Sequence, residues 1–131
     1  MYIELQADDP RRAATFYRGL FGWEIEPVDE NLPVEYWRLH TPELADIPVT
    51  RRVAGGIVQR QAPPPQPGAG TNAYVCSFEV EDFEAAAGLI ERLGGKVALA
   101  KFAVPGRCWQ GYFLDPEGNT FGLFEVDEAA A

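Results

Sequence analysis

The feature that most constrains this chain is an internal repeat with an offset of 73 residues. At this offset Asp9 superimposes on Asp82, each able to cap a helix, and the apolar positions of the two following helices superimpose as well. A strand pattern precedes each helix and three strand patterns follow it. One half alone buries too little surface to cover both its helix and its sheet, so we expect the halves to pair about a pseudo-twofold axis. A chance match of two amphipathic helices is the alternative, since any helix start brings a similar pattern.

The first half starts with alternating apolar and polar residues at 2–6, which is typical of a strand. A helix follows, with Asp9 as its cap, Pro10 at its first position and Gly22 as its left-handed stop. Further strands are predicted at residues 23–26, 36–40 and 55–59. The first module therefore covers about residues 1–60.

The second half repeats this order over about residues 71–127. A strand is predicted at 74–80, and Asp82 begins a helix that ends before the two glycines at 94–95. The remaining strands are predicted at residues 96–100, 108–114 and 120–126, with a turn at 115–119 between the last two.

Between the halves, residues 61–70 contain four prolines. Proline cannot join an inner strand ladder and favours extended backbone, so this segment is predicted to be a linker. A docking motif for a proline-recognising module is the alternative. The prolines alone do not indicate such a motif, because plain linkers share this composition. We expect one domain over residues 1–131, built from the two modules.

Composition limits the function classes. The chain carries 20 acidic and 11 basic residues, a net charge of −9, which disfavours a nucleic acid or an anionic membrane surface as partner. It has one histidine and two cysteines, so a histidine cluster or a cysteine-rich zinc site within one chain is excluded. No apolar run approaches a membrane span, and no export signal is visible, so we expect a cytoplasmic location with reduced thiols.

Several short motifs together resemble the vicinal oxygen chelate superfamily, which includes glyoxalase I, bleomycin-resistance proteins, extradiol dioxygenases and methylmalonyl-CoA epimerase. They occur at residues 7–10, 16–17, 20–23, 55–57, 80–82, 93–97, 104–106 and 114–123. Each is weak alone, but the set covers nearly the whole chain. The nearest resemblance is to the glyoxalase-like subgroup that often lacks an assigned reaction.

The resemblance implies an α+β fold of two βαβββ modules. Their eight strands would form a curled mixed sheet around a concave cup, with the helices on the convex side. It also implies a homodimer, because small members often build or complete the cup between subunits. Family enzymes hold a divalent metal in the cup through both modules, and the metal acts as a Lewis acid on vicinal oxygens.

The positions at which the resemblance implies metal ligands do not hold suitable residues in this chain. The positions fall on Tyr2, Val75 and Gly122, and the strand after Gly56 offers no strong candidate for the fourth. No metal site is therefore predicted, although a divalent metal is the family's usual cofactor. We predict a small-molecule binding protein of the glyoxalase/bleomycin-resistance type. The alternatives are a superfamily enzyme (lyase, isomerase or dioxygenase) acting on a small oxygenated metabolite, and a module that lends its cup or its linker to a partner protein.

Strand parity predicts which side chains face the cup. The predicted ligand-binding residues are Tyr2, Glu4, Tyr36, Arg38, His40, Ser77 and Phe124. His40 is the candidate general base, or else a surface histidine. Glu4 could contact a ligand cation, act as a base, or pair with Arg38.

Several further residues are weaker candidates for ligand contacts. Trp109 and Tyr112 could stack on a flat ligand or simply pack. The side chains of Tyr74 and Cys76 are predicted to face the helix, with Cys76 inert. Arginines that could bind an anion or be solvated loop charges are Arg51, Arg52 and Arg60.

Overall fold

The structure is a computed structural model that describes residues 2–42, 46–66 and 74–131. The last part of the predicted linker, residues 67–70, lies outside the described residues. No helix in the described part of the chain has the length and apolar character that crossing a membrane requires.

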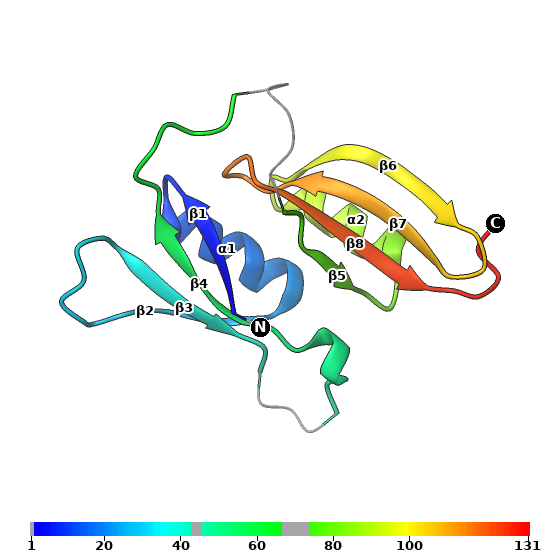
Figure 1. Cartoon of the computed structure of the whole chain (residues 1–131), viewed down its shortest axis with the longest axis horizontal. Coiled ribbons are helices and arrows are strands. Elements are labelled where there is room, and N and C mark those ends of the chain that lie inside the picture. The colour runs from blue at the N-terminus through cyan, green and yellow to red at the C-terminus, as the bar shows by residue number, and fades with distance from the viewer. Residues whose placement is uncertain (1, 43–45, 67–73) are drawn as a thin grey trace.

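Within the described residues, eight strands form two four-stranded mixed sheets, one for each half of the sequence (Figure 1). The first sheet has the order β1-β4-β3-β2, with β1 and β4 parallel and the other neighbours antiparallel. Its strands are β1 (Ile3–Ala7), β2 (Glu24–Pro27), β3 (Tyr36–His40) and β4 (Ala54–Gln59). Between β1 and β2 runs helix α1 (Pro10–Phe21), and the short 3-10 helix η1 (Val49–Arg51) precedes β4.

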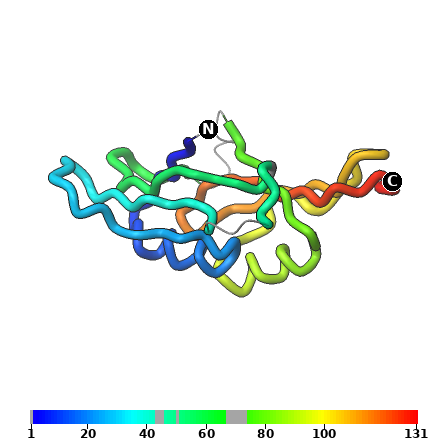
Figure 2. Tube along the Cα trace, turned by 90° about the horizontal axis from the view of Figure 1, so that it is seen from below, coloured from blue at the N-terminus to red at the C-terminus, as the bar shows by residue number. Residues whose placement is uncertain are grey.

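The second sheet has the matching order β5-β8-β7-β6, and its parallel pair is β5 with β8. Its strands are β5 (Ser77–Glu79), β6 (Lys96–Val104), β7 (Cys108–Leu114) and β8 (Thr120–Val126), and helix α2 (Phe83–Arg92) follows β5. Both helices lie on the same side of the molecule (Figure 2). The predicted α+β class and the repeated βαβββ order are confirmed.

Helix α1 begins and ends as its sequence predicts. The Asp9 side chain accepts a hydrogen bond from the backbone N–H of Arg12 at 3.1 Å, and Pro10 occupies the first turn, where no N–H is needed. Gly22 ends the helix in the left-handed region at φ 68°, and its N–H donates to the carbonyl of Arg18.

Two predicted strand limits are wrong. The strand predicted at 74–80 is only Ser77–Glu79, and Tyr74 is 90% exposed instead of facing the helix. Its partner β8 reaches back only to the Cys76 carbonyl, which accepts from the N–H of Gly122, so Tyr74 precedes the ladder. Strand β6 runs on to Val104, beyond the predicted limit at 100, with two irregularities in its pairing with β7.

The two modules share one hydrophobic core, to which each contributes aromatic rings. Tyr17 of α1 packs against Phe121 of β8 with ring centroids 6.1 Å apart, and Phe16 packs against the same ring at 6.2 Å. Phe121 in turn packs on Phe113 of β7 at 5.9 Å. Because burial of such rings is the main driving force for packing, this shared core fixes α1 against the second sheet.

A buried polar joint reinforces that packing beside the N-terminal end of α1. The Glu117 carboxylate accepts hydrogen bonds from the backbone N–H of Asp8 at 2.8 Å and from Arg12 Nε at 2.7 Å. The Tyr17 hydroxyl donates to Asp115 at 2.7 Å. The turn at residues 115–119 of the second module is thereby locked onto the start of α1 in the first.

Candidate functional site

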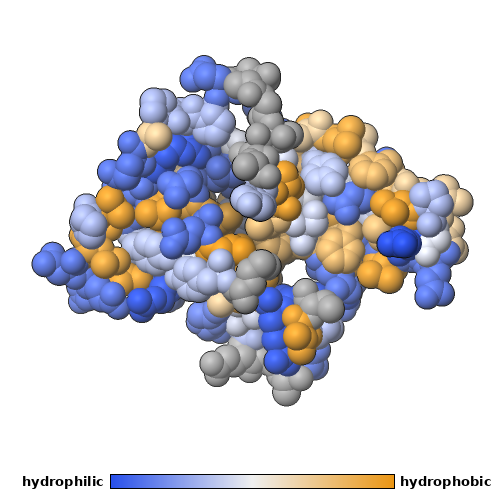
Figure 3. Space-filling model, viewed as in Figure 1, coloured by the Kyte–Doolittle hydropathy of each residue, from blue (hydrophilic) through white to orange (hydrophobic). Residues whose placement is uncertain are grey.

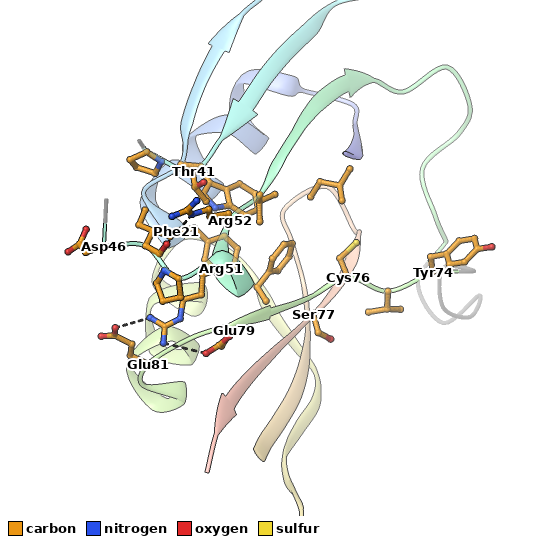
Figure 4. A pocket seen from close by; sticks show the side chains of 18 residues that line it. Phe21, Thr41, Asp46, Arg51, Arg52, Tyr74, Cys76, Ser77, Glu79 and Glu81 are labelled. Carbon is orange, nitrogen blue, oxygen red and sulfur yellow. Dashed lines mark hydrogen bonds and ion pairs between the residues drawn. The ribbon is translucent and has the colours of Figure 1, made fainter. Parts of the chain in front are cut away.

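A cavity of about 790 Å³ lies between the two modules, at the opposite end of α1 from the polar joint. One wall comes from the first module and the other from the segment that leads into and along β5 (Figure 4). The apolar lining residues are Ile3, Phe21, Trp23, Pro42, Ile47, Pro48, Val53, Tyr74, Val75, Cys76 and Phe78. The polar lining residues are Thr41, Asp46, Arg51, Arg52, Ser77, Glu79 and Glu81.

Three of the aromatic lining residues pack against one another. Phe21 and Trp23 lie on either side of the helix stop, and their ring centroids are 4.7 Å apart. Phe78 of β5 packs against both, at 4.9 Å from Phe21 and 5.3 Å from Trp23. Because Gly22 turns the chain sharply, Trp23 returns beside Phe21 and both rings meet the second module there. We call these three residues the aromatic trio.

A charged triad crosses from the first module to the second. Arg51, at the end of η1, donates to the Glu81 carboxylate at 2.8 Å and lies 3.6 Å from the Glu79 carboxylate (Figure 4). The hydrogen bond to Glu81 raises the pKa of Arg51, burial opposes this rise, and the charge of Glu79 adds to it. The Glu79 side chain is 16% exposed, whereas that of Glu81 is 82% exposed. The neighbouring Arg52 donates from Nε to the carbonyl of Ile47 at 3.0 Å.

Of the predicted ligand-binding residues, three meet on the face of the first sheet that points away from α1. The hydroxyl oxygens of Tyr2 and Tyr36 are 2.7 Å apart, and Tyr36 donates to Glu4 at 3.4 Å. The Tyr36 hydroxyl occupies the space in which a side chain at Gly56 would lie. Burial raises the pKa of Tyr36, and its contacts with Tyr2 and Glu4 raise it further. Figure 3 shows that this half of the molecule presents a mainly hydrophilic face, whereas the other half is more hydrophobic.

The structure does not pair Glu4 with Arg38, so that predicted pairing is wrong. Arg38 lies 3.2 Å from Glu30 instead, and both side chains are more than half exposed. Glu4 and Arg38 both stand opposite Gly56, in neighbouring strands on either side of β4, which leaves the width of that strand between them. His40 is also at the surface, where Nε2 lies 3.5 Å from Glu24.

In the second module Ser77 is the predicted residue that lines the cavity. Its hydroxyl also accepts from Gln110 Nε2 at 3.3 Å, and both groups fill the space that a side chain at Gly122 would need. Phe124 stands opposite Gln110 in the β7–β8 pairing and is half-buried. The predicted set is therefore spread over two sheet faces.

The residues present do not fit the family's metal. Tyr2 is tied to Tyr36, Val75 offers no ligand atom, and Gly122 has neither a side chain nor the space for one. Among the described residues, no group of three or more histidine, cysteine, aspartate or glutamate side chains could hold a metal ion. We therefore derive no chemical step through a metal at these positions.

Sequence reasoning missed most of the cavity. Phe21 and Trp23 belong to the motif at residues 20–23 and Phe78 to the predicted strand at 74–80, but no local pattern indicates that η1 reaches β5 and closes a cavity there. Cys76 packs against the hydrophobic core, but it is only half-buried and also lines the cavity.

The structure gives Arg60 and Trp109 partners within the chain. The Arg60 side chain is 5% exposed and donates to Asp8 and to Asn119, so it is part of the polar joint and neither an open anion site nor a solvated charge. Trp109 packs on the Lys101 ammonium at 4.8 Å and donates to Asp127 at 3.0 Å.

Comparison with known proteins supports the family. The model of the glyoxalase-like domain family matches residues 2–124. No curated protein matches the chain.

Solved structures share the fold at low identity. A hypothetical protein from S. aureus has a TM-score of 0.67 and 17% identity, over 96% of each chain. A glyoxalase/bleomycin resistance protein/dioxygenase family enzyme from Burkholderia phytofirmans PsJN has a TM-score of 0.68 and 16% identity, over 96% of this chain and 97% of that one. The fosfomycin resistance protein FosX from Listeria monocytogenes, complexed with Mn(II) and sulfate, has a TM-score of 0.67 and 14% identity, over 97% of this chain and 91% of that one. Because the family model covers most of its length, this chain belongs to the glyoxalase-like domain family.

Proposed function

We propose that this chain is a small-molecule binding protein of the glyoxalase/bleomycin-resistance type that works without the family's metal. The observation that carries the proposal is the cavity of about 790 Å³ between the modules, with the aromatic trio in its lining. Its volume is within the range of roughly 300–1,000 Å³ typical of small-molecule sites. A mainly apolar lining with a few convergent polar groups is also typical of such sites.

The ligand class of FosX is not carried over. FosX was complexed with Mn(II) and an anion, sulfate. In this chain both arginines that line the cavity already have partners, Arg51 in the charged triad and Arg52 on a backbone carbonyl. The described lining carries three carboxylates, Asp46, Glu79 and Glu81, against these two guanidinium groups, so we propose a ligand that is not an anion.

The assembly and the location are part of the same proposal. The chain would fold as one domain, because the shared core and the polar joint connect its modules. It would act as a homodimer, as the family resemblance implies, in the cytoplasm, as the sequence predicts. Sedimentation equilibrium of the purified chain tests the dimer, and a monomer at micromolar concentration would contradict it.

Titration calorimetry with 2-naphthalenemethanol, an uncharged aromatic probe, tests the binding function. The protein is first dialysed against a chelator, and its metal content is measured. We expect binding that chelation leaves unchanged and that Val75→Trp abolishes, because Val75 is 36% exposed and lines the cavity. Val126→Trp is the matched control, since Val126 is exposed but does not line the cavity. Binding that disappears with the metal, or that survives Val75→Trp, would refute the proposal.

An enzyme is the second candidate, and the cluster on the open face of the first sheet favours it. A phenol that stays protonated beside a carboxylate, as Tyr36 does beside Glu4, can donate a hydrogen bond to a developing oxyanion. A superfamily enzyme would then convert a small oxygenated metabolite at Tyr2, Glu4 and Tyr36. The test is a screen of α-ketoaldehydes and catechols for turnover that Tyr36→Phe abolishes while the naphthalenemethanol affinity stays the same. Turnover that is insensitive to Tyr36→Phe would remove this candidate.

A further inference from the structure

The charged triad pairs its two carboxylates unevenly. Arg51 makes its hydrogen bond of 2.8 Å to Glu81, whose side chain is 82% exposed and could be solvated by water. Glu79 is 16% exposed, yet its contact with Arg51 is 3.6 Å long. A carboxylate withdrawn from water needs its partner more than an exposed one does. The inner carboxylate is therefore the less well compensated of the two.

The remaining charges of the lining leave this imbalance in place. Arg51 is one positive charge between two negative ones, and Asp46 adds a third carboxylate to the lining. Arg52 is the other basic residue there, and its Nε is engaged by a backbone carbonyl. The described lining carries three carboxylates and two guanidinium groups, so its net charge is negative, and the chain as a whole carries −9.

The aromatic trio supplies the complementary part of a recognition site. Phe78 and Glu79 are successive residues of β5, so their side chains leave opposite faces of this edge strand, yet both line the cavity. Because one cavity reaches both side chains, an apolar body can pack on the rings while a positively charged group lies beside Glu79. Aromatic faces also attract cations directly, which strengthens such sites.

We infer that the cavity selects a small organic cation with an apolar or aromatic body, held by Glu79 at its charged end and by the aromatic trio at the other. This inference rests on the proposed binding function and names the ligand class of that site. Arg51 keeps its hydrogen bond to Glu81 when the ligand binds, so the cation completes the pairing of Glu79 without displacing Arg51.

Three probes of similar size test the charge preference in titration calorimetry. They are 2-naphthylmethylammonium, 2-naphthalenemethanol and 2-naphthoate, which are positive, neutral and negative at pH 7. We expect the ammonium compound to bind about tenfold more tightly than the alcohol, the size of effect that a partly desolvated charge pair can give. The naphthoate should bind most weakly. Raising the salt concentration should weaken the ammonium compound selectively.

Glu79→Gln and Glu81→Gln form a matched pair of variants, because they neutralise the two carboxylates of the same triad. Glu79→Gln should remove the preference for the ammonium compound and leave the alcohol within about twofold, since only the charged end is affected. Glu81→Gln should keep most of the preference, because the amide oxygen can still accept from Arg51 and Glu79 keeps its charge. A preference that survives Glu79→Gln, or that is lost equally in both variants, would overturn the inference.

Labelling of the Cys76 thiol locates the binding site independently. In a Cys108→Ser background, the ammonium probe should slow labelling of Cys76, which lines the cavity. Equal affinity of the ammonium compound and the alcohol, with Cys76 protected by both, would overturn the cation inference and leave the proposed binding function standing. If none of the three probes binds or protects Cys76, the proposed function fails together with the inference.

Discussion

Glu117 and Glu79, two buried or largely buried carboxylates of the second module, each contact an arginine of the first module. They differ in how completely their hydrogen-bonding capacity is used. At the polar joint the Glu117 side chain has no exposed surface, and it accepts from two backbone N–H groups and from Arg12 at 2.7 Å. At the cavity Glu79 is also largely withdrawn from water, but its contact with Arg51 is 3.6 Å long. The first arrangement stabilises the packing of the modules. The second leaves bonding capacity free beside a cavity, as a ligand site requires.

The largest effect should come from the fully paired carboxylate. Glu117→Gln keeps the shape but removes the charge that Arg12 and the start of α1 contact. We expect the free energy of unfolding to fall by about 2 kcal/mol, because a buried charged acceptor is lost. Urea denaturation measures this. The matched change Glu79→Gln should cost less than about 1 kcal/mol. Equal losses in the two variants would remove the distinction between joint and cavity.

Removing the Tyr17 hydroxyl, which donates to Asp115, should have the next largest effect on the free energy of unfolding. Tyr17→Phe removes that donor without changing the ring packing, and Asp115 is buried. We expect a loss of about 1–2 kcal/mol in the free energy of unfolding, measured in urea. A neutral result would mean that Asn119 and the turn backbone satisfy Asp115 without Tyr17.

The same carboxylate should also give the joint a pH dependence. Burial raises the pKa of folded Asp115 above its usual 3.8, although hydrogen bonds from Tyr17 and Asn119 oppose the rise. The folded state therefore binds a proton more tightly than the unfolded state does. This contribution to stability is fully present below pH 3.8 and is lost as the pH rises through the folded pKa. The stability of the wild type minus that of Asp115→Asn should fall as the pH rises from below 3.8 through the folded pKa of Asp115. A difference that rises with pH would show that the hydrogen bonds outweigh burial.

The smallest effect should come from an ion pair that belongs to neither region. Arg38 and Glu30 contact each other at 3.2 Å, but both side chains are more than half exposed. Arg38→Ala should change the free energy of unfolding by less than about 0.5 kcal/mol, because solvent and salt screen such pairs. A probe affinity that falls in this variant would move the binding site towards the open face of the first sheet.

The sequence predicts the fold much better than the site. Asp9 and Gly22 are local signals, and the structure places both at the ends of α1 as expected. The repeat offset likewise finds both modules, because each strand pattern needs only its own alternation. Tyr74 was misplaced because its strand depends on a partner, β8, that is far along the chain.

The cavity depends on contacts that no local pattern carries. Arg51 reaches Glu79 and Glu81 only once η1 has folded against β5, which brings together residues about 30 positions apart. Strand parity did place Tyr2, Glu4 and Tyr36 on one face, and the structure brings them into contact. Parity could not reveal the cavity that lies between the modules.

A crystal structure of the complex with 2-naphthylmethylammonium tests the central claim most directly. The account predicts the naphthalene ring against Phe21, Trp23 and Phe78, and the ammonium nitrogen within about 4 Å of the Glu79 carboxylate. It also predicts that the Arg51–Glu81 contact stays in place. A probe bound instead at Tyr2, Glu4 and Tyr36 on the open face of the first sheet would contradict it.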